Sequence, residues 1–136
     1  MPIIEKVKKL NLPIGQYVVI GSGILDALGI RSANDIDLTV LPELHENLRS
    51  TGLWKEENRY GKIFLIQEGI EINPDISWDA YPVSTEEVIK TAHVIDGVPF
   101  MNLDELIRFK TALGREKDFE DIERILDYKK ESIKNI

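Results

Sequence analysis

The chain contains no cysteine and only two histidines, His45 and His93. The absence of cysteine excludes disulfide bonds, thiolate zinc sites and a cysteine nucleophile. With only two histidines, a histidine-rich metal centre is not expected either. The chemistry of this chain must therefore come from other side chains.

Long apolar runs are also missing, and the 17 basic residues are outnumbered by 24 acidic ones. No segment approaches the roughly 20 consecutive apolar residues that a membrane span needs, and residues 1–13 are too short and too charged for a signal peptide. The expected location is therefore the cytoplasm, with no membrane association. The net charge of −7 argues against non-specific binding to nucleic acid.

What is present is the composition of an ordinary globular protein. The 136 residues are 43% hydrophobic and 30% charged, which is typical of a folded chain and of one domain, residues 1–136. A domain of this size leaves little chain for a separate substrate-binding domain.

Hydrophobic periodicity predicts short strands alternating with helices. Strands are expected at residues 17–20, 36–40, 62–67 and 70–73, with a further short strand pattern in 93–100 that Asp96-Gly97 interrupts. Helices are expected at 3–10, 24–28, 42–49, 84–92, 103–113 and 118–130, and capping residues mark several of their ends. The predicted fold class is mixed α/β (α+β), with a mixed sheet of four to five strands, helices packed on one side and a helical C-terminus.

The segment from Tyr17 to Val40 is the most informative part of the sequence. An apolar strand at 17–20 leads into Gly21-Ser22-Gly23 and then into a short helix. Such a turn points backbone N–H groups outward, which suits phosphate oxygens, and the Ser22 hydroxyl adds a donor. A simple tight connection between strand and helix gives the same pattern.

Two aspartates follow in the next strand. Asp35 and Asp37 are two residues apart, so both carboxylates leave the same face while Ile36 points to the core. Neighbouring carboxylates raise each other's pKa unless a cation lies between them. Magnesium is the natural choice because it prefers oxygen ligands and shares them with substrate phosphates. Two solvated aspartates at a strand end are the alternative.

Together, the Gly21-Ser22 turn and the Asp35-Ile36-Asp37 strand resemble the signature of the nucleotidyltransferase superfamily, whose fold is related to the polymerase β core. The resemblance implies a nucleotide held at Gly21 and Ser22. It also implies two Mg²⁺ ions, with Mn²⁺ as a substitute, held by Asp35, Asp37 and a third carboxylate on a neighbouring strand. Two ions roughly 4 Å apart would then clamp the attacking and leaving oxygens.

The third carboxylate has two candidates, Glu71 and Asp75. Glu71 is favoured because Ile70 and Ile72 flank it, as expected for an acid on a core strand, although an ordinary amphipathic strand has the same pattern. Asp75 follows Pro74, which favours a turn.

The segment 103–126 resembles the C-terminal motif of small nucleotidyltransferases related to abortive-infection and toxin–antitoxin systems. The residues that carry the resemblance are Lys110, Gly114-Arg115, Lys117-Asp118 and Asp121-Ile122. By resemblance, Lys110 would approach the nucleotide phosphates and Asp118 would hold that lysine or the pocket wall. A snorkelling lysine and a first-turn helix acid are the structural alternatives. Arg31 is a weaker candidate for an anion contact.

The expected function is transfer of a nucleoside monophosphate from a nucleoside triphosphate to a hydroxyl group of an RNA, a protein or a small molecule. The alternative is a non-catalytic module that binds a nucleotide or a partner protein, such as one component of a toxin–antitoxin pair. The geometry of the third carboxylate distinguishes the two.

Overall fold

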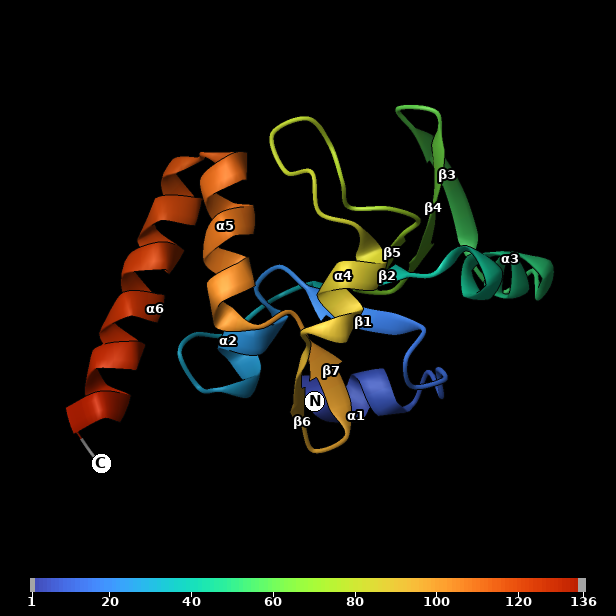
Figure 1. The fold of residues 1–136 in the computed structure, drawn as a ribbon. Coiled ribbons are helices and arrows are strands. Elements are labelled where there is room, and N and C mark those ends of the chain that lie inside the picture. Colours follow the sequence, from blue (N-terminus) through green and yellow to red (C-terminus); the bar gives the residue numbers. More distant parts are fainter. Residues whose placement is uncertain (1, 135–136) are drawn as a thin grey trace.

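The computed structural model describes residues 2–134, which form a seven-stranded mixed sheet with six helices around it (Figure 1). Across the sheet the strands are β3 (Lys55–Arg59), β4 (Lys62–Gln67), β5 (Ile70–Asn73), β2 (Ile36–Val40), β1 (Tyr17–Ile20), β7 (Val98–Phe100) and β6 (His93–Ile95). The helices are α1 (Ile3–Lys8), α2 (Gly23–Ala27), α3 (Pro42–Ser50), α4 (Thr85–Lys90), α5 (Leu103–Leu113) and α6 (Glu116–Lys134). Strand β1 pairs in parallel with β7, and β2 with β5; the other pairs are antiparallel.

The mixed α/β class and the helical C-terminus are confirmed, but the sheet is larger than the predicted four to five strands. One extra strand comes from the pattern at 93–100, which is a hairpin of β6 and β7 joined at Asp96 and Gly97. Both turn residues have positive φ, +48° and +82°, as the tightest two-residue hairpin turns require.

The other extra strand, β3, has no apolar pattern at all. Its sequence Lys-Glu-Glu-Asn-Arg is mostly exposed, because β3 lies at the sheet edge and pairs only with β4. Charged residues on an edge strand protect it from pairing with other chains. The hairpin turn to β4 is Tyr60-Gly61, both with positive φ.

Helices lie on both faces of the sheet, so the expectation of helices on one side is wrong. A Cβ added at Gly23 would lie 2.4 Å from Val19 Cγ1 and 3.1 Å from Ile3 Cδ1, which puts α1 and α2 on the Val19 face. Thr39, paired with Val18 on the opposite face, shares a 2.8 Å hydrogen bond with Thr85 of α4. All four residues of β1 are therefore buried.

The C-terminal helices α5 and α6 pack against each other beside the sheet and run in opposite directions (Figure 1). The predicted caps are confirmed: Asn102 Oδ1 accepts a 2.8 Å hydrogen bond from the Glu105 N–H, and Gly114 ends α5 at φ +65°. Helix α6 begins at Glu116 and reaches Lys134, beyond the predicted 118–130. The turn at Gly114 thus brings the first turn of α6 back next to Lys110.

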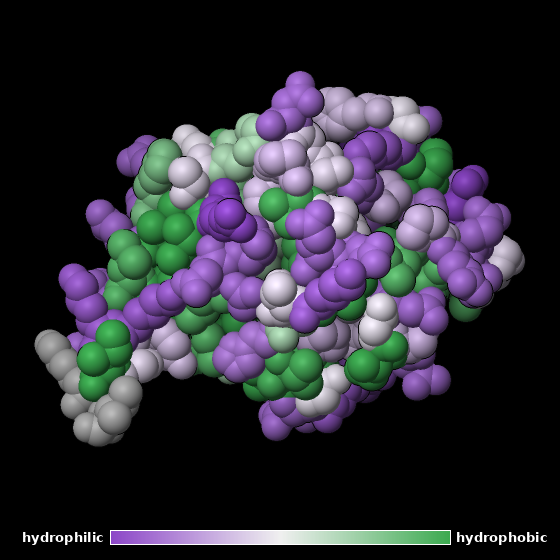
Figure 2. Space-filling model, in the orientation of Figure 1, coloured by the Kyte–Doolittle hydropathy of each residue, from purple (hydrophilic) through white to green (hydrophobic). Residues whose placement is uncertain are grey.

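The surface is largely polar, with apolar patches over α6 (Figure 2). Helix α6 carries three exposed apolar side chains, Phe119, Leu126 and Ile133. Within residues 2–134, none of the helices combines the length and apolar character that crossing a bilayer requires.

Replacing Gly23 with alanine is expected to destabilise the fold. The new methyl group would fall 2.4 Å from Val19 Cγ1, so β1 or α2 must shift, and overpacking of this kind costs about 1–3 kcal/mol. Urea unfolding measures the loss. The double variant with Val19→Ala should recover part of it, and an unchanged midpoint for Gly23→Ala alone would contradict the packing described.

Candidate functional site

A cleft of about 450 Å³ lies where β1 ends and β2 begins, facing α5 and the start of α6. Strands β1 and β2 are antiparallel with Ile20 opposite Asp37, so the turn after β1 and the acids of β2 reach the same sheet edge. The seven residues predicted for the site all line this cleft: Gly21, Ser22, Asp35, Asp37, Glu71, Lys110 and Asp118. One pocket therefore collects predicted residues that lie as far apart in the chain as Gly21 and Asp118.

Asp37 and Glu71 form a pair of carboxyl groups at the sheet edge. They are direct neighbours in the parallel pairing of β2 with β5, so both side chains leave the same face. Burial raises the pKa of Asp37 to about 7, helped by the charge of Glu71, a hydrogen bond shared with Glu71 and the charge of Asp35. Nearby positive charge therefore does not outweigh burial and the mutual repulsion of the acids.

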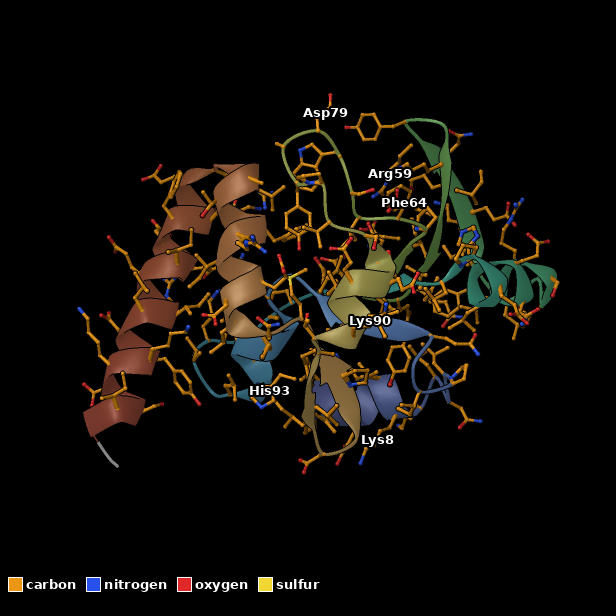
Figure 3. The ribbon with its side chains drawn as sticks, in the orientation of Figure 1. Lys8, Arg59, Phe64, Asp79, Lys90 and His93 are labelled. Carbon is orange, nitrogen blue, oxygen red and sulfur yellow. The ribbon has the colours of Figure 1, made fainter. Side chains whose placement is uncertain are left out.

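Arg59 supplies part of that charge, and sequence reasoning missed it because strand β3 was not predicted. Its Nη1 donates a hydrogen bond to Glu71 Oε1 and its Nε donates one of 2.7 Å to Glu57. The guanidinium carbon lies 5.0 Å from the centre of the Phe64 ring, and Figure 3 labels both side chains. Arg59 lowers the pKa of Asp37, but burial outweighs this effect.

A second cavity, of about 480 Å³, lies beside the carboxyl groups. Asp35, Asp37 and Glu71 line both cavities, and Lys55, Glu57 and Arg59 line only the second. The carboxyl groups therefore stand between two open spaces.

Asp75, the alternative third acid, lies outside both cavities. Its Oδ2 accepts a 3.2 Å hydrogen bond from Lys62, and its Oδ1 accepts one of 3.1 Å from the Ser77 N–H. Glu71 is therefore the candidate that the fold brings to Asp37. Among residues 2–134, no three His, Asp or Glu side chains are arranged to hold a metal ion as they stand.

Lys110 is almost completely buried on the opposite wall. Its Nζ lies 2.9 Å from Asp121 Oδ2 and 3.5 Å from Asp118 Oδ1, and it donates a 3.4 Å hydrogen bond to Ser22 Oγ. Only 5% of the side chain is exposed, so it does not snorkel to solvent. The predicted closeness of Asp118 and Lys110 is confirmed.

Arg31 joins the same cluster. Its Nε and Nη2 donate two 2.6 Å hydrogen bonds to the Asp121 carboxylate, and Nη2 donates another of 2.7 Å to Ser22 Oγ. Ser22 thus accepts hydrogen bonds from Arg31 and Lys110, and its own proton remains available to a ligand. Arg31 was expected to contact an anion of the ligand, and its partners within the protein are the Asp121 carboxylate, the Ser22 hydroxyl and the Ser32 carbonyl oxygen.

Asp121 is the acid that sequence reasoning did not select for the site. Burial raises its pKa, but hydrogen bonds from Arg31 and Lys110 outweigh this and hold the pKa well below the usual range. The signal that could have found it is helical spacing, because Asp118 and Asp121 lie three residues apart on one face of α6.

Asp118 holds the turn between α5 and α6. Its Oδ2 accepts hydrogen bonds from the Arg115 N–H at 3.2 Å and from Arg115 Nε at 2.6 Å. Despite its burial, these bonds lower the pKa of Asp118, so the carboxylate stays charged next to Lys110. Asp118 is thus a positioning residue for the lysine.

The Gly21-Ser22 turn brings backbone close to the acids. Gly21 has φ +64°, which L side chains rarely adopt, and a Cβ there would lie 3.6 Å from Asp37 Oδ2. Glycine is therefore favoured here by backbone conformation rather than by lack of space.

Replacing Asp37 with asparagine is expected to stabilise the ligand-free protein at pH 8. A carboxyl pKa near 3.8 in the unfolded state and about 7 in the folded state lowers the stability as the pH rises between these values. The variant lacks this titration, so its free energy of unfolding should exceed the parent's by about 2–4 kcal/mol at pH 8 and match it near pH 4.

Urea unfolding at both pH values tests this, with Asp75→Asn as the matched control. Hydrogen bonds from Ser77 and Lys62 outweigh the effect of burial and lower the pKa of Asp75. Its charged form therefore stabilises the fold above the unfolded pKa, and the control should lose stability at pH 8. Parallel pH profiles for Asp37→Asn and the parent would contradict the raised pKa of Asp37.

Replacing Asp121 with asparagine should leave Arg31 and Lys110 without their shared anion. Breaking a buried ion pair from one side costs about 3–5 kcal/mol, measurable by urea unfolding at pH 7. Glu120→Gln, on the exposed side of α6, should change stability by less than about 0.5 kcal/mol. Adding Lys110→Met to Asp121→Asn should restore part of the loss, and a loss below about 1 kcal/mol would show that solvent screens the cluster.

Comparisons with known proteins add no relationship to this picture. No protein-family model and no curated protein matches the chain. Its function must therefore be inferred from what the cleft brings together: a glycine-serine turn, paired carboxyl groups and a buried lysine.

Proposed function

We propose that this chain is a metal-dependent nucleotidyltransferase with a polymerase β-like fold. It would transfer a nucleoside monophosphate from a nucleoside triphosphate to a hydroxyl acceptor and release pyrophosphate. The order of β1, turn, α2 and acidic β2 supports this family, as does the parallel neighbour β5 that carries the third acid.

One observation carries the proposal. A single cleft places Ser22 and Lys110 on one wall and the Asp37–Glu71 pair on the other. The first group offers donors to phosphate oxygens, and the second offers carboxylate oxygens to a cation. A triphosphate with its magnesium ion has both needs at once.

The acids fit the ion in their chemistry, and the nucleotide phosphates would supply further oxygen ligands. Asp35, Asp37 and Glu71 would hold two Mg²⁺ ions, and Mn²⁺ accepts the same oxygen ligands. Magnesium is commonly bound by one or two carboxylates plus substrate phosphates and water, so the Asp37–Glu71 pair suits an ion that arrives with the nucleotide. Ions held by these residues would supply positive charge to the phosphates and to the attacking oxygen.

The other wall would bind and orient the triphosphate. Ser22 Oγ can donate its proton to a phosphate oxygen while it accepts hydrogen bonds from Arg31 and Lys110. Lys110 is held by Asp118 and Asp121, so it keeps one position instead of following the ligand. Preorganised charge of this kind is the main catalytic resource in phosphoryl transfer.

The reaction forms one bond and breaks one bond. The acceptor oxygen attacks the α-phosphorus, the bond from that phosphorus to the bridging oxygen breaks, and the hydroxyl proton is lost. The ion held by the acids would lower the pKa of the acceptor hydroxyl, so that solvent water can take this proton. The acceptor is an RNA, a protein or a small molecule, and the second cavity beside the acids offers it an approach.

Nucleotide binding without transfer is the second candidate, and Arg59 favours it. Its hydrogen bond to Glu71 places a positive charge where a metal ion would sit. If that contact persists when a nucleotide binds, the protein is a sensor or a partner-binding module, for example within a toxin–antitoxin pair.

Thermal unfolding with each of the four nucleoside triphosphates, with and without Mg²⁺, tests the proposal. A ligand at about 100 times its dissociation constant stabilises the fold by roughly 2.7 kcal/mol. We expect a magnesium-dependent rise in melting temperature that Asp37→Ala abolishes and the matched control Asp127→Ala, on the exposed side of α6, retains. No shift with any triphosphate would overturn the proposal.

A labelled triphosphate distinguishes transfer of the nucleotide from binding alone. A triphosphate labelled at the α-phosphate should pass its label to RNA, protein or small molecules of a cell extract only with active protein and Mg²⁺. Magnesium-dependent binding without transfer, unchanged in Arg59→Gln, would favour the sensor. Transfer that appears or rises in Arg59→Gln would show that Arg59 restrains the site.

A further inference from the structure

A third cavity, of about 590 Å³, opens next to the cleft and differs from it in chemistry. It lies between α5, the β3–β4 hairpin and the loop at residues 74–84, which rises between them (Figure 1). Four of the ten aromatic residues of the chain line it: Tyr60, Phe64, Trp78 and Phe109. Its walls are thus suited to a flat, apolar group.

The third cavity is continuous with the cleft of the proposed site. The two share four lining residues, Ile20, Asn73, Phe109 and Leu113. Lys110 follows Phe109 directly in α5. One turn of this helix therefore contributes Lys110 to the cleft and Phe109 to the aromatic wall of the third cavity. A ligand held at Ser22 can therefore extend into the aromatic space.

The Trp78 side chain is positioned by its neighbours but stays partly exposed. Its backbone exchanges two hydrogen bonds with Tyr81, of 3.1 and 2.9 Å, and its ring lies 5.6 Å from that of Tyr81 and 5.8 Å from that of Phe109. Tyr81 is in turn fixed by a 2.8 Å hydrogen bond to Glu105. Even so, 38% of Trp78 remains exposed, which leaves ring surface free for stacking.

The opposite wall is the β3–β4 hairpin. Its turn residue Tyr60 is 97% exposed. The ring of Phe64, on strand β4, packs against the Arg59 guanidinium. Figure 3 labels Asp79 at the tip of the loop and Phe64 on the hairpin that faces it. Polar groups of Lys62, Asp75 and Ser77 border the same cavity and can meet the edge of a ring.

We propose that this aromatic cavity holds the nucleobase of the triphosphate, an inference that rests on the proposed function. The second cavity, beside Lys55, Glu57 and Arg59, is charged and offers no aromatic side chain, so it suits the acceptor instead. The nucleotide then lies across α5, with its phosphates at Ser22 and its base against Trp78. The site discriminates a nucleotide from a bare polyphosphate through Trp78.

Titration calorimetry in the presence of Mg²⁺ tests this by comparing the affinities of two kinds of probe. The first kind is the four nucleoside triphosphates, and the second is inorganic tripolyphosphate, which lacks a base. Stacking on one aromatic ring contributes enough that Trp78→Ala should weaken the tightest triphosphate by about tenfold or more, and tripolyphosphate by less than about twofold. Tyr60→Asn is the second variant, because it is exposed and asparagine tolerates its positive φ of +55°. Phe119→Ala, an exposed aromatic residue on α6, is the matched control and should change neither affinity.

Fluorescence gives an independent readout. The chain has two tryptophans, so Trp54→Phe leaves Trp78 as the only indole, and its emission should be quenched by the triphosphate but not by tripolyphosphate. Equal affinities for both probes, or unchanged emission during triphosphate binding, would overturn the base site and leave the proposed function standing. If neither probe binds, the proposed function fails as well.

Discussion

The cleft depends on one carboxylate, that of Asp121, which contacts three cations: Arg31, Lys110 and Arg124. Arg31 and Lys110 both donate to Ser22 Oγ, so two positive charges meet at one hydroxyl and would repel each other at that distance. Asp121 lies between them and accepts hydrogen bonds from both. It thereby attaches the helical pair α5–α6 to the turn that follows β1, and the two walls of the cleft keep their spacing.

The sheet side of the cleft carries an excess of negative charge. Asp37 and Glu71 are brought together by the register of β2 and β5, and Arg59 compensates only one of them directly. One wall therefore presents satisfied cations with a free hydroxyl proton, and the other presents acids in need of a cation. This asymmetry within a single pocket is the basis of our proposal that the cleft binds a metal-bound polyphosphate.

The elements that local sequence determines were predictable, and those that depend on pairing were not. The β1 strand, its Gly21-Ser22 turn and the capping residues Ser84 and Asn102 carry their signals within a few residues. Strand β3 has no apolar alternation because it is an edge, so Arg59 could not be assigned to Glu71. Asp121 and Arg31 are 90 positions apart, and nothing short of the docked helices reveals that they meet. The mixed sheet was expected, but the sequence pattern did not reveal that the edge strand β3 and the β6–β7 hairpin widen it to seven strands.

The position of Asp121 in α6 also has a consequence for biosynthesis. During translation, Ser22, Arg31 and both β-strand acids leave the ribosome long before residue 121 does. Before the Asp121 carboxylate is in place, Arg31 and Lys110 have no common counter-ion. The wall of the cleft formed by Ser22 and Lys110 then lacks the contacts that fix it. This wall of the cleft therefore forms only after α6 has been made, so its formation reports that α5 and α6 have docked.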